Sequence, residues 1–222
     1  MTIMERIISI VTPYDCIVCG FEGSIVCRAC KPIICPAVPS RCYICHASTQ
    51  NYSTCHKCRR SSKLRRLYVR TEFSGAAKQL VYSLKFSNNQ SAAKVVAYFM
   101  LQTLPKDLMA LVTPVPTASS RLRLRGYDHA KLISSKIAKA LELEHISVAT
   151  RLNQTRQVGS KRSIRVSQLN GAYRLGNIAI IKGSNILLVD DVVTTGATLE
   201  SIAAQLKLTG AKTVDAVVFS QR

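Results

Sequence analysis

The fold of this chain is decided by the stretch Ile186-Leu-Leu-Val-Asp-Asp-Val-Val-Thr-Thr-Gly-Ala-Thr-Leu199. The apolar run from Ile186 to Val189 is typical of a buried parallel strand, and Asp190 and Asp191 stand where that strand is expected to end. A loop rich in threonine follows. Apolar residues then recur at helical spacing, namely Leu199, Ile202, Leu206 and Leu208. Strand, acidic pair, loop and helix in this order predict a binding site for a sugar phosphate.

The residue types in this stretch suit the two halves of such a ligand. Backbone N–H groups and hydroxyls at the start of a helix bind phosphate, and Gly196 allows the backbone to approach it closely. Carboxylates accept hydrogen bonds from the 2′- and 3′-hydroxyls of ribose. The alternative is an ordinary strand end followed by a threonine N-cap. The acidic pair, the loop and the apolar helix together favour the ligand site.

The stretch resembles the phosphoribosyl-pyrophosphate (PRPP) signature of type I phosphoribosyltransferases. In that family the two acids hold the ribose hydroxyls and the loop holds the 5-phosphate. The resemblance implies that Asp190 and Asp191 bind ribose. It assigns the phosphate to Thr194, Thr195, Gly196, Ala197 and Thr198.

The charge of the chain is strongly unbalanced. Its 222 residues include 31 Lys and Arg against 12 Asp and Glu, a net charge of +19. This excess predicts an anionic partner, because cations attract anions over long distances and release counterions from phosphates. Nucleic acid ranks first, a phosphorylated small molecule second and an anionic membrane surface third. A solvated basic surface without a partner is the alternative.

Two runs without acidic residues carry much of this charge. The first spans Lys57 to Arg70, and the second spans Arg151 to Arg174. We interpret the second as a long mobile loop or β-arm, with a solvated linker as the alternative. The residues predicted to bind nucleic acid are Arg59, Arg60, Arg65, Arg66, Arg125, Arg156, Lys161, Arg162 and Arg165.

The nine cysteines of the chain all lie between Cys16 and Cys58. Eight of them form Cys-x-x-Cys pairs, a spacing that lets two thiolates bind one metal ion. Disulfides are the alternative, but we find no export signal, and redox motifs do not occur four at a time. We therefore expect two structural Cys₄ zinc sites, with Cys35 left over. The expected ligands are Cys16, Cys19, Cys27, Cys30, Cys42, Cys45, Cys55 and Cys58.

The pairing of these motifs has two possible forms. In the sequential form, 16–30 holds one ion and 42–58 the other, which keeps the closed loops short. In the cross-braced form, the first pair joins the third. His46 and His56 lie beside ligands, but four thiolates leave no free position, so we expect both histidines on the surface.

The remaining periodicity indicates an α/β protein. We expect strands at 67–73, 111–116 and 213–219, the central strand within 178–189, and helices at 75–86, 92–104 and 127–143. Such alternation predicts a parallel sheet flanked by helices. The expected domains are a zinc-ribbon domain at 1–62, with a short amphipathic helix within Met1 to Val11, and an α/β domain at 63–222. No segment reaches the ~20 apolar residues of a membrane span, and we expect a cytoplasmic protein without membrane insertion.

The whole chain is similar to the ComF (ComFC/GntX) family of bacterial phosphoribosyltransferase-like proteins. The similarity rests on the cysteine-rich start and on an ordered series of short motifs. These are Leu84-Lys-Phe-Ser87, Pro114-Val-Pro116, Arg125-Gly-Tyr127, Arg156-Gln-Val-Gly159, Gly171-Ala-Tyr-Arg174 and Val189 to Thr198. The chain departs from the family at Asp128-His129, where Asn-Gln is usual, and Cys35 is extra.

This resemblance implies the type I phosphoribosyltransferase fold with an N-terminal double zinc ribbon. It implies PRPP with Mg²⁺ as ligand, Pro116 and Thr117 in the pyrophosphate-binding turn, and a flexible loop at 156–173 that closes over PRPP. Family members assist uptake or handling of single-stranded DNA in natural transformation. Single-stranded DNA and a competence helicase are therefore expected partners.

Three functions are compatible with these observations. The first is an accessory protein that binds a ribose phosphate and single-stranded DNA, with Tyr127 and Tyr173 as stacking residues or, alternatively, as core tyrosines. The second is an active phosphoribosyltransferase that moves ribose 5-phosphate from PRPP to an unknown acceptor. The third is a PRPP-sensing regulator without chemistry. We favour the first.

Overall fold

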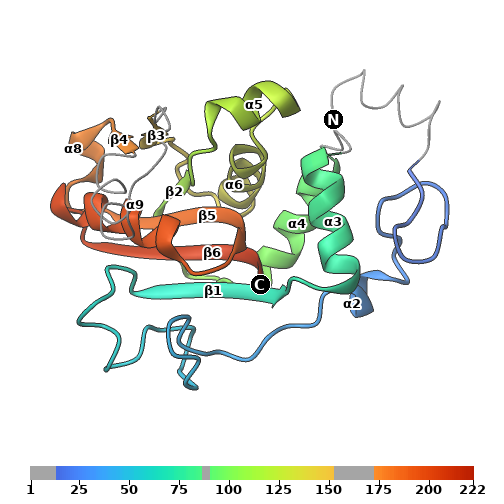
Figure 1. Cartoon of the computed structure of the whole chain (residues 1–222), viewed down its shortest axis with the longest axis horizontal. Coiled ribbons are helices and arrows are strands. Elements are labelled where there is room, and N and C mark those ends of the chain that lie inside the picture. Colours follow the sequence, from blue (N-terminus) through green and yellow to red (C-terminus); the bar gives the residue numbers. More distant parts are fainter. Residues whose placement is uncertain (1–13, 87–90, 153–172) are drawn as a thin grey trace, which may run out of the picture.

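A parallel sheet forms the centre of the computed structural model, which describes residues 14–86, 91–152 and 173–222 (Figure 1). Its four strands lie in the order β1-β6-β5-β2. Their bounds are β1 Arg66–Glu72, β2 Leu111–Pro114, β5 Asn185–Val193 and β6 Thr213–Gln221. A separate antiparallel pair is formed by β3 (Ala149–Arg151) and β4 (Tyr173–Leu175).

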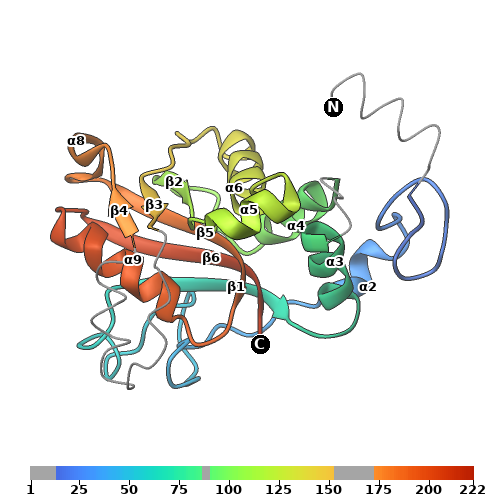
Figure 2. The ribbon, with the colours of Figure 1, turned by 45° about the horizontal axis from the view of Figure 1, so that its top comes forward.

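Helices cover the two faces of this sheet. Helices α3, α4 and α6 lie against one face, and α9 lies against the other (Figures 1 and 2). The helices are α2 Lys31–Ile34, α3 Gly75–Phe86, α4 Ser91–Leu101, α5 Ser119–Arg125, α6 His129–Ala140, α8 Ile178–Ile181 and α9 Ala197–Leu208. The predicted α/β architecture is confirmed.

Strand β5 shows why the central run is apolar at every position. Successive side chains of a strand point to opposite faces, and here both faces are covered. Leu187 and Val189 belong to the core beneath α3, α4 and α6, whereas Ile186 and Leu188 belong to the core beneath α9. All four are essentially inaccessible to solvent.

Several expected boundaries were wrong. The central strand does not end at Val189, because β6 runs beside it as far as Gln221 and the pairing continues through Val193. Asp190 and Asp191 therefore lie within β5. The sheet strand expected within 178–189 is β5, which begins at Asn185, and it is preceded by the short helix α8 and a turn at Gly183.

The helix ends also differ from expectation. The predicted helix at 92–104 ends at Leu101, and the one at 127–143 spans only His129–Ala140, after an N-cap at Asp128. Leu208 does not join the apolar face of α9, because it is the last residue of the helix and is 88% exposed.

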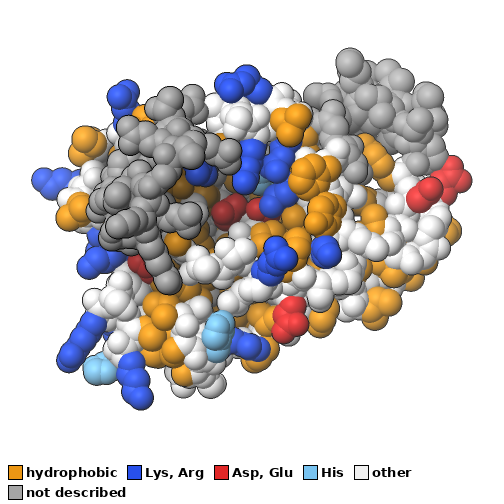
Figure 3. Space-filling model, in the orientation of Figure 1, with side chains coloured by type: hydrophobic (Ala, Val, Ile, Leu, Met, Phe, Trp, Pro, Cys, Tyr) orange, Lys and Arg blue, Asp and Glu red, His pale blue; other side chains and the backbone are white. Residues whose placement is uncertain are grey.

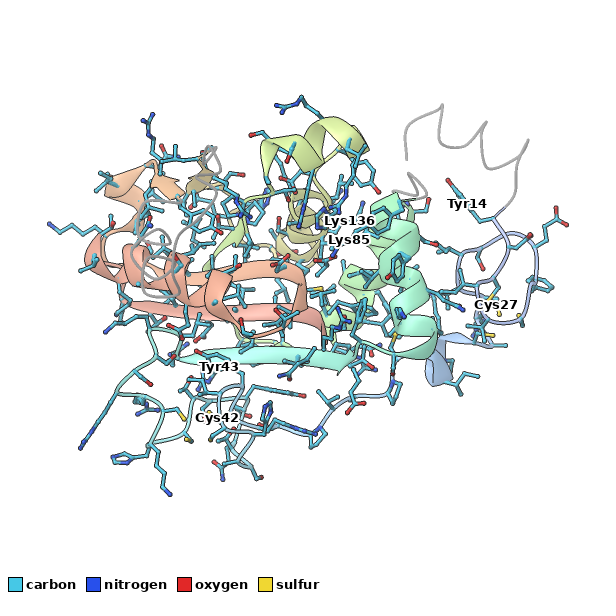
Figure 4. The ribbon with its side chains drawn as sticks, viewed as in Figure 1. Tyr14, Cys27, Cys42, Tyr43, Lys85 and Lys136 are labelled. Atoms are coloured by element: carbon cyan, nitrogen blue, oxygen red, sulfur yellow. The ribbon has the colours of Figure 1, made fainter. Side chains whose placement is uncertain are left out.

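The cysteine-rich segment packs on both sides of the sheet. Cys16, Cys27 and Cys30 belong to the core beneath α3 and α4, whereas Tyr43 belongs to the core beneath α9. Figure 4 shows Cys27 beside α3, and Cys42 and Tyr43 next to β1. The segment thus shares its apolar core with the sheet, and the expected division at 62/63 stays a prediction.

None of the helices in the described part of the chain is long and apolar enough to cross a membrane. The helix expected within Met1 to Val11 lies outside the described residues.

Candidate ribose phosphate site and metal centres

The predicted phosphate loop joins β5 to α9. Thr194 and Thr195 are exposed, and Gly196 is the N-cap of α9 with a left-handed φ of 75°. Because this N-cap has no side chain, it leaves the first N–H groups of the helix uncapped. Among the described residues, a long contact of 3.4 Å from the Ala197 N–H to the Thr195 hydroxyl is the only side-chain contact that covers one of them. Uncapped N–H groups at the start of a twelve-residue helix suit an anion such as phosphate.

The two carboxylates lie just before this loop in different surroundings. Asp190 is partly exposed, and its Oδ1 accepts a hydrogen bond of 2.9 Å from the N–H of Asp191. Asp191 is buried, and its Oδ2 lies 2.6 Å from the Lys85 ammonium. The Nε2 atom of His129 lies 3.6 Å from Oδ1 of the same carboxylate. Asp191 is thus anchored by α3 and α6, while Asp190 is available to a ligand.

The surroundings shift the pKa values of the two carboxyl groups in opposite directions. Burial, together with the neighbouring charge of Asp191, raises the pKa of Asp190 well above its ordinary value. Burial acts on Asp191 in the same sense, but the hydrogen bond from His129 and the charge of Lys85 outweigh it, and its pKa is lowered. Asp191 is therefore the ionised anchor of the pair. Asp190 is the carboxyl group that takes up a proton first as the pH falls.

Hydrogen bonds fix the orientation of His129. The Arg125 guanidinium donates to its Nδ1 atom over 3.1 Å, so Nε2 carries the proton and faces Asp191. The neighbouring departure from the family pattern also has a structural role. Asp128 accepts from the Lys131 N–H as the N-cap of α6, and it accepts from the Thr117 hydroxyl over 3.1 Å. Asp128 thereby holds the turn that contains Thr117.

The predicted pyrophosphate turn reaches the same edge of the sheet as the carboxylates. Strands β2 and β5 are parallel, Pro114 pairs with Val189, and the Val115 N–H donates to the Val189 carbonyl over 2.9 Å. Pro116 and Thr117 follow at once and are half-buried. Parallel strands bring their carboxyl ends together, so this turn lies beside Asp190 and Asp191.

Sequence reasoning missed the roles of Lys85 and His129. Lys85 stands in the quoted motif Leu84-Lys-Phe-Ser87, four residues after the buried Val81 and thus beside the apolar face of α3. The available signal was a cation at the border of an apolar face, although its partner Asp191 lies far away in the sequence. The signal for His129 was its place in the unusual Asp128-His129 pair.

The segment that carries the second group of cysteines, residues 42–63, contacts the phosphate loop and the start of α9. We call it the second cysteine segment. The Tyr43 hydroxyl donates to the Glu200 carboxylate in the first turn of α9, and it lies 2.9 Å from the Ser62 hydroxyl. Glu200 also accepts from the Ser62 hydroxyl over 2.5 Å and from the Lys63 N–H over 2.9 Å. A Cβ atom at Gly196 would lie 3.0 Å from a ring carbon of Tyr43. The ring therefore packs against the loop backbone.

The cysteines form two separate four-thiol clusters. Within each, the sulfur atoms lie within 4.8 Å of one another, and the members are Cys16, Cys19, Cys27 and Cys30 in one and Cys42, Cys45, Cys55 and Cys58 in the other. This grouping corresponds to the sequential pairing and not to the cross-braced one. Four thiols around one point suit tetrahedral zinc. His46 and His56 are exposed, as expected.

Backbone donors lower the pKa of one thiol in each cluster, whereas the pKa values of Cys30 and Cys58 are raised to about 12 by burial and by hydrogen bonds with neighbouring thiols. Burial raises the pKa of Cys16, but N–H groups that include that of Cys27 outweigh this effect and lower it to about 6. The same balance in the second cluster, with N–H donors from Cys55, Cys45 and Ile44, lowers the pKa of Cys42 to about 6. Thiolates are the form that binds zinc. Cys35 belongs to neither cluster, and burial raises its pKa to about 12.

The predicted nucleic-acid residues have diverse surroundings. Arg59 and Arg60 are exposed. Arg65 instead makes a two-pronged ion pair with the buried Asp215, with N–O distances of 2.9 and 2.5 Å, and Arg66 lies 4.0 Å from the same carboxylate. Arg156, Lys161, Arg162 and Arg165 lie outside the described residues. Figure 3 shows Lys and Arg side chains around acidic side chains near the middle of one face.

Neither of the two tyrosines that the sequence suggested for stacking has a fully exposed ring. Tyr173 is only 6% exposed and belongs to the core beneath α9, so the alternative of a core tyrosine applies to it. Tyr127 is half-buried, and its hydroxyl donates to the Leu84 carbonyl at the end of α3. Both side chains hold parts of the fold together.

Several known proteins are similar to this chain. A family model described as the phosphoribosyl transferase domain matches residues 125–222. DNA utilization protein YhgH of Salmonella typhimurium is 30% identical over 158 residues, which cover 67% of this chain and 69% of that protein. Competence protein ComFC of Streptococcus pneumoniae is 25% identical over 142 residues, 64% of this chain and 62% of that protein. Glutamine PRPP amidotransferase from B. subtilis aligns with a TM-score of 0.47 and 18% identity, over 63% of this chain and 30% of that chain.

The parallel sheet, the covering helices and the strand-loop-helix site define a type I phosphoribosyltransferase fold. The cysteine clusters at its amino-terminal side are compatible with a double zinc ribbon. The chain belongs to the ComF family, which includes these competence and DNA utilization proteins.

Proposed function

We propose that this protein binds PRPP or a related ribose phosphate and single-stranded DNA, and that it assists the handling of DNA in the cytoplasm during uptake. The observation that carries the ribose phosphate part is the junction of β5 and α9. There an acidic pair, with one member anchored and one accessible, precedes a helix start without a side-chain cap. Hydroxyl groups and a phosphate need these two environments side by side.

Each part of the junction has a role in this proposal. Asp190 accepts hydrogen bonds from the ribose hydroxyls, and Asp191 orders the strand end through Lys85 and His129. The N–H groups at the start of α9 and the hydroxyls of the threonine loop hold the 5-phosphate. The Pro116–Thr117 turn receives the pyrophosphate of PRPP, in a position that Asp128 fixes.

Magnesium suits this proposal as a companion of PRPP. His129, Asp190 and Asp191 place potential ligand atoms within 4.8 Å of one another. Both nitrogens of His129 already contact Arg125 and Asp191, so the carboxylate of Asp190 is the better ligand. Mg²⁺ prefers oxygen atoms and commonly binds one or two carboxylates together with phosphate oxygens. It would neutralise pyrophosphate charge beside Asp190.

The DNA part of the proposal is supported by the family and by the basic surface. The relatives carry the names of competence and DNA utilization proteins. Arg59 and Arg60 are exposed next to the second cysteine cluster, whereas Arg65 is occupied by Asp215. We therefore assign phosphate contacts first to Arg59 and Arg60. The basic run at 156–165 and a competence helicase as a partner stay predictions from the sequence.

An active phosphoribosyltransferase is the second candidate. It is favoured by the turn at Pro116–Thr117, which ends β2 beside the carboxylates where a pyrophosphate leaving group would need support. Release of pyrophosphate from PRPP in the presence of an acceptor distinguishes this function from binding alone.

The DNA part is tested by fluorescence anisotropy with a labelled oligonucleotide at increasing salt, with and without PRPP·Mg²⁺. Each phosphate contact contributes a slope of about 0.7 in the logarithmic salt dependence of single-strand binding. The double variant Arg59→Gln/Arg60→Gln should lower the slope by roughly 1.4. The control Lys94→Gln/Lys106→Gln removes equal charge at exposed sites elsewhere and should leave it unchanged. Absence of single-strand binding by the wild type would reject this part.

A further inference from the structure

An aromatic groove lies between α3 and α5, next to the ribose phosphate site. It has a volume of about 370 Å³ and is lined by Phe73, Tyr82, Phe86 and Leu124, with Lys85, Arg121 and Arg125 among its cations. The exposed fractions are 48% for Tyr82, 64% for Phe86 and 81% for Leu124. Three large apolar side chains are thus exposed to solvent at one place on the surface.

The rings form a ladder along the groove. The ring centroids of Phe73 and Tyr82 are 6.4 Å apart, and those of Tyr82 and Phe86 are 5.5 Å apart. Tyr82 and Phe86 are four residues apart on α3, so one turn of a rigid helix sets their spacing. Both lie away from the buried face of that helix, which consists of Ala77, Leu80, Val81 and Leu84. The core therefore does not require these rings at these positions.

Cations accompany the ladder. The Arg125 guanidinium lies 5.5 Å from the centroid of Phe86, and the Lys78 ammonium lies 5.9 Å from that of Tyr82. Arg121 is exposed at the rim. The described residues that line the groove include no carboxylate. Flat rings interleaved with positive charge suit a ligand that presents flat bases and phosphates in alternation.

The groove joins the ribose phosphate site directly. Lys85 lines the groove, and its ammonium ion-pairs with Asp191. Arg125 lies over Phe86 and also donates to His129, which faces Asp191. Figure 3 shows hydrophobic side chains beside the central group of blue and red side chains, and Figure 4 labels Lys85 where α3 faces the sheet. A strand in the groove would pass beside a bound ribose phosphate.

We propose that this groove is the site where bases of single-stranded nucleic acid stack, with Tyr82 and Phe86 as the platform and Arg121 and Lys78 as phosphate contacts. The inference rests on the proposed function, and it names the surface that holds the DNA bases. It assigns the base contacts to α3 and one phosphate contact to α5, whereas the sequence had suggested Tyr127 and Tyr173 as stacking residues.

The test compares an ordinary oligonucleotide with an abasic one of the same length, measured by anisotropy. Loss of one aromatic stack weakens single-strand binding by roughly 5- to 150-fold. Tyr82→Leu and Phe86→Leu should each weaken binding of the ordinary strand in this range and leave the abasic strand unaffected. The control Tyr98→Leu removes another exposed ring with a lysine 5.0 Å from its centroid, outside the groove, and should change neither. Zinc content and PRPP affinity serve as checks that the variants are folded.

A second variant gives a direct signal of stacking. The chain contains no tryptophan, so Phe86→Trp introduces a single tryptophan into the groove, whose fluorescence can be excited at wavelengths where tyrosine does not absorb. It should bind the strand as well as the wild type, and its fluorescence should be quenched by the ordinary but not by the abasic oligonucleotide. Equal binding of the strand by wild type, Tyr82→Leu and Phe86→Leu would overturn the groove inference while the proposed function stands. Quenching by free nucleosides but not by the strand would also overturn it. Failure of the wild type to bind any single strand would reject the proposed function itself.

Discussion

A methyl group at position 196 should reveal how firmly the second cysteine segment supports the phosphate loop. Gly196 has a φ of 75°, where a side chain costs about 1–2 kcal/mol. In addition, the new Cβ would lie 3.0 Å from Cε2 and 3.3 Å from Cδ2 of Tyr43. That ring cannot retreat easily, because its hydroxyl is bound by Glu200 and Ser62. Overpacking of this kind costs about 1–3 kcal/mol more.

The assay is urea unfolding of the zinc-loaded protein, and a matched glycine supplies the reference. Gly183 has a φ of 79° and nothing within 4 Å of an added Cβ, so Gly183→Ala pays only the backbone term. We expect Gly196→Ala to lose about 1–3 kcal/mol more than Gly183→Ala. In a Tyr43→Leu background most of this difference should vanish. Equal losses for the two glycine variants would refute the reasoning that Tyr43 packs against the loop.

The remaining predictions concern metal, phosphate and protons. Metal analysis should find two zinc ions per chain. Cys55→Ser should leave one ion, because the two clusters are separate. Disulfide bonds between these thiols under reducing conditions would contradict this prediction. Thr195→Ala should weaken PRPP binding in a calorimetric titration by about 1.5–3 kcal/mol through loss of a charge-assisted hydrogen bond, whereas Thr150→Ala, an exposed threonine on β3, should not. The pKa of Asp191 is lower in the folded than in the unfolded chain, so its contribution to stability is present above about pH 4 and is lost as the pH falls below it. In an Asp190→Asn background, urea midpoints between pH 3 and 6 should show this loss, and adding Asp191→Asn should remove it.

Local patterns in the sequence were enough for the parts of the fold that depend on local physics. The run at Ile186–Val189 had to be a covered strand, because consecutive apolar residues need two buried faces. The helix at Gly75–Phe86 and its four buried residues follow from helical periodicity. The cysteine spacing predicted two four-thiol groups. Strand ends were harder, because β5 continues only where β6 supplies partners.

The parts that could not be predicted depend on contacts between distant residues. Arg65 seemed a free cation in a basic run, but β6 brings Asp215 to it from 150 residues away. The contact of Tyr43 with Glu200 spans 157 residues. The ion pair of Lys85 with Asp191 and the groove between α3 and α5 have no local signature, because each joins segments that are distant in the sequence. The binding site could thus be predicted as a motif, but the long-range contacts that hold its residues in place could not.

The central claim is that the junction of β5 and α9 binds a ribose phosphate, and calorimetric titration of zinc-loaded protein with PRPP·Mg²⁺ tests it most directly. The account predicts one saturable site per chain. Asp190→Asn should weaken binding, because it removes the accessible carboxylate, whereas the control Asp107→Asn, at an exposed aspartate elsewhere, should not. Absence of binding to PRPP, ribose 5-phosphate and nucleotides by the wild type would contradict the account.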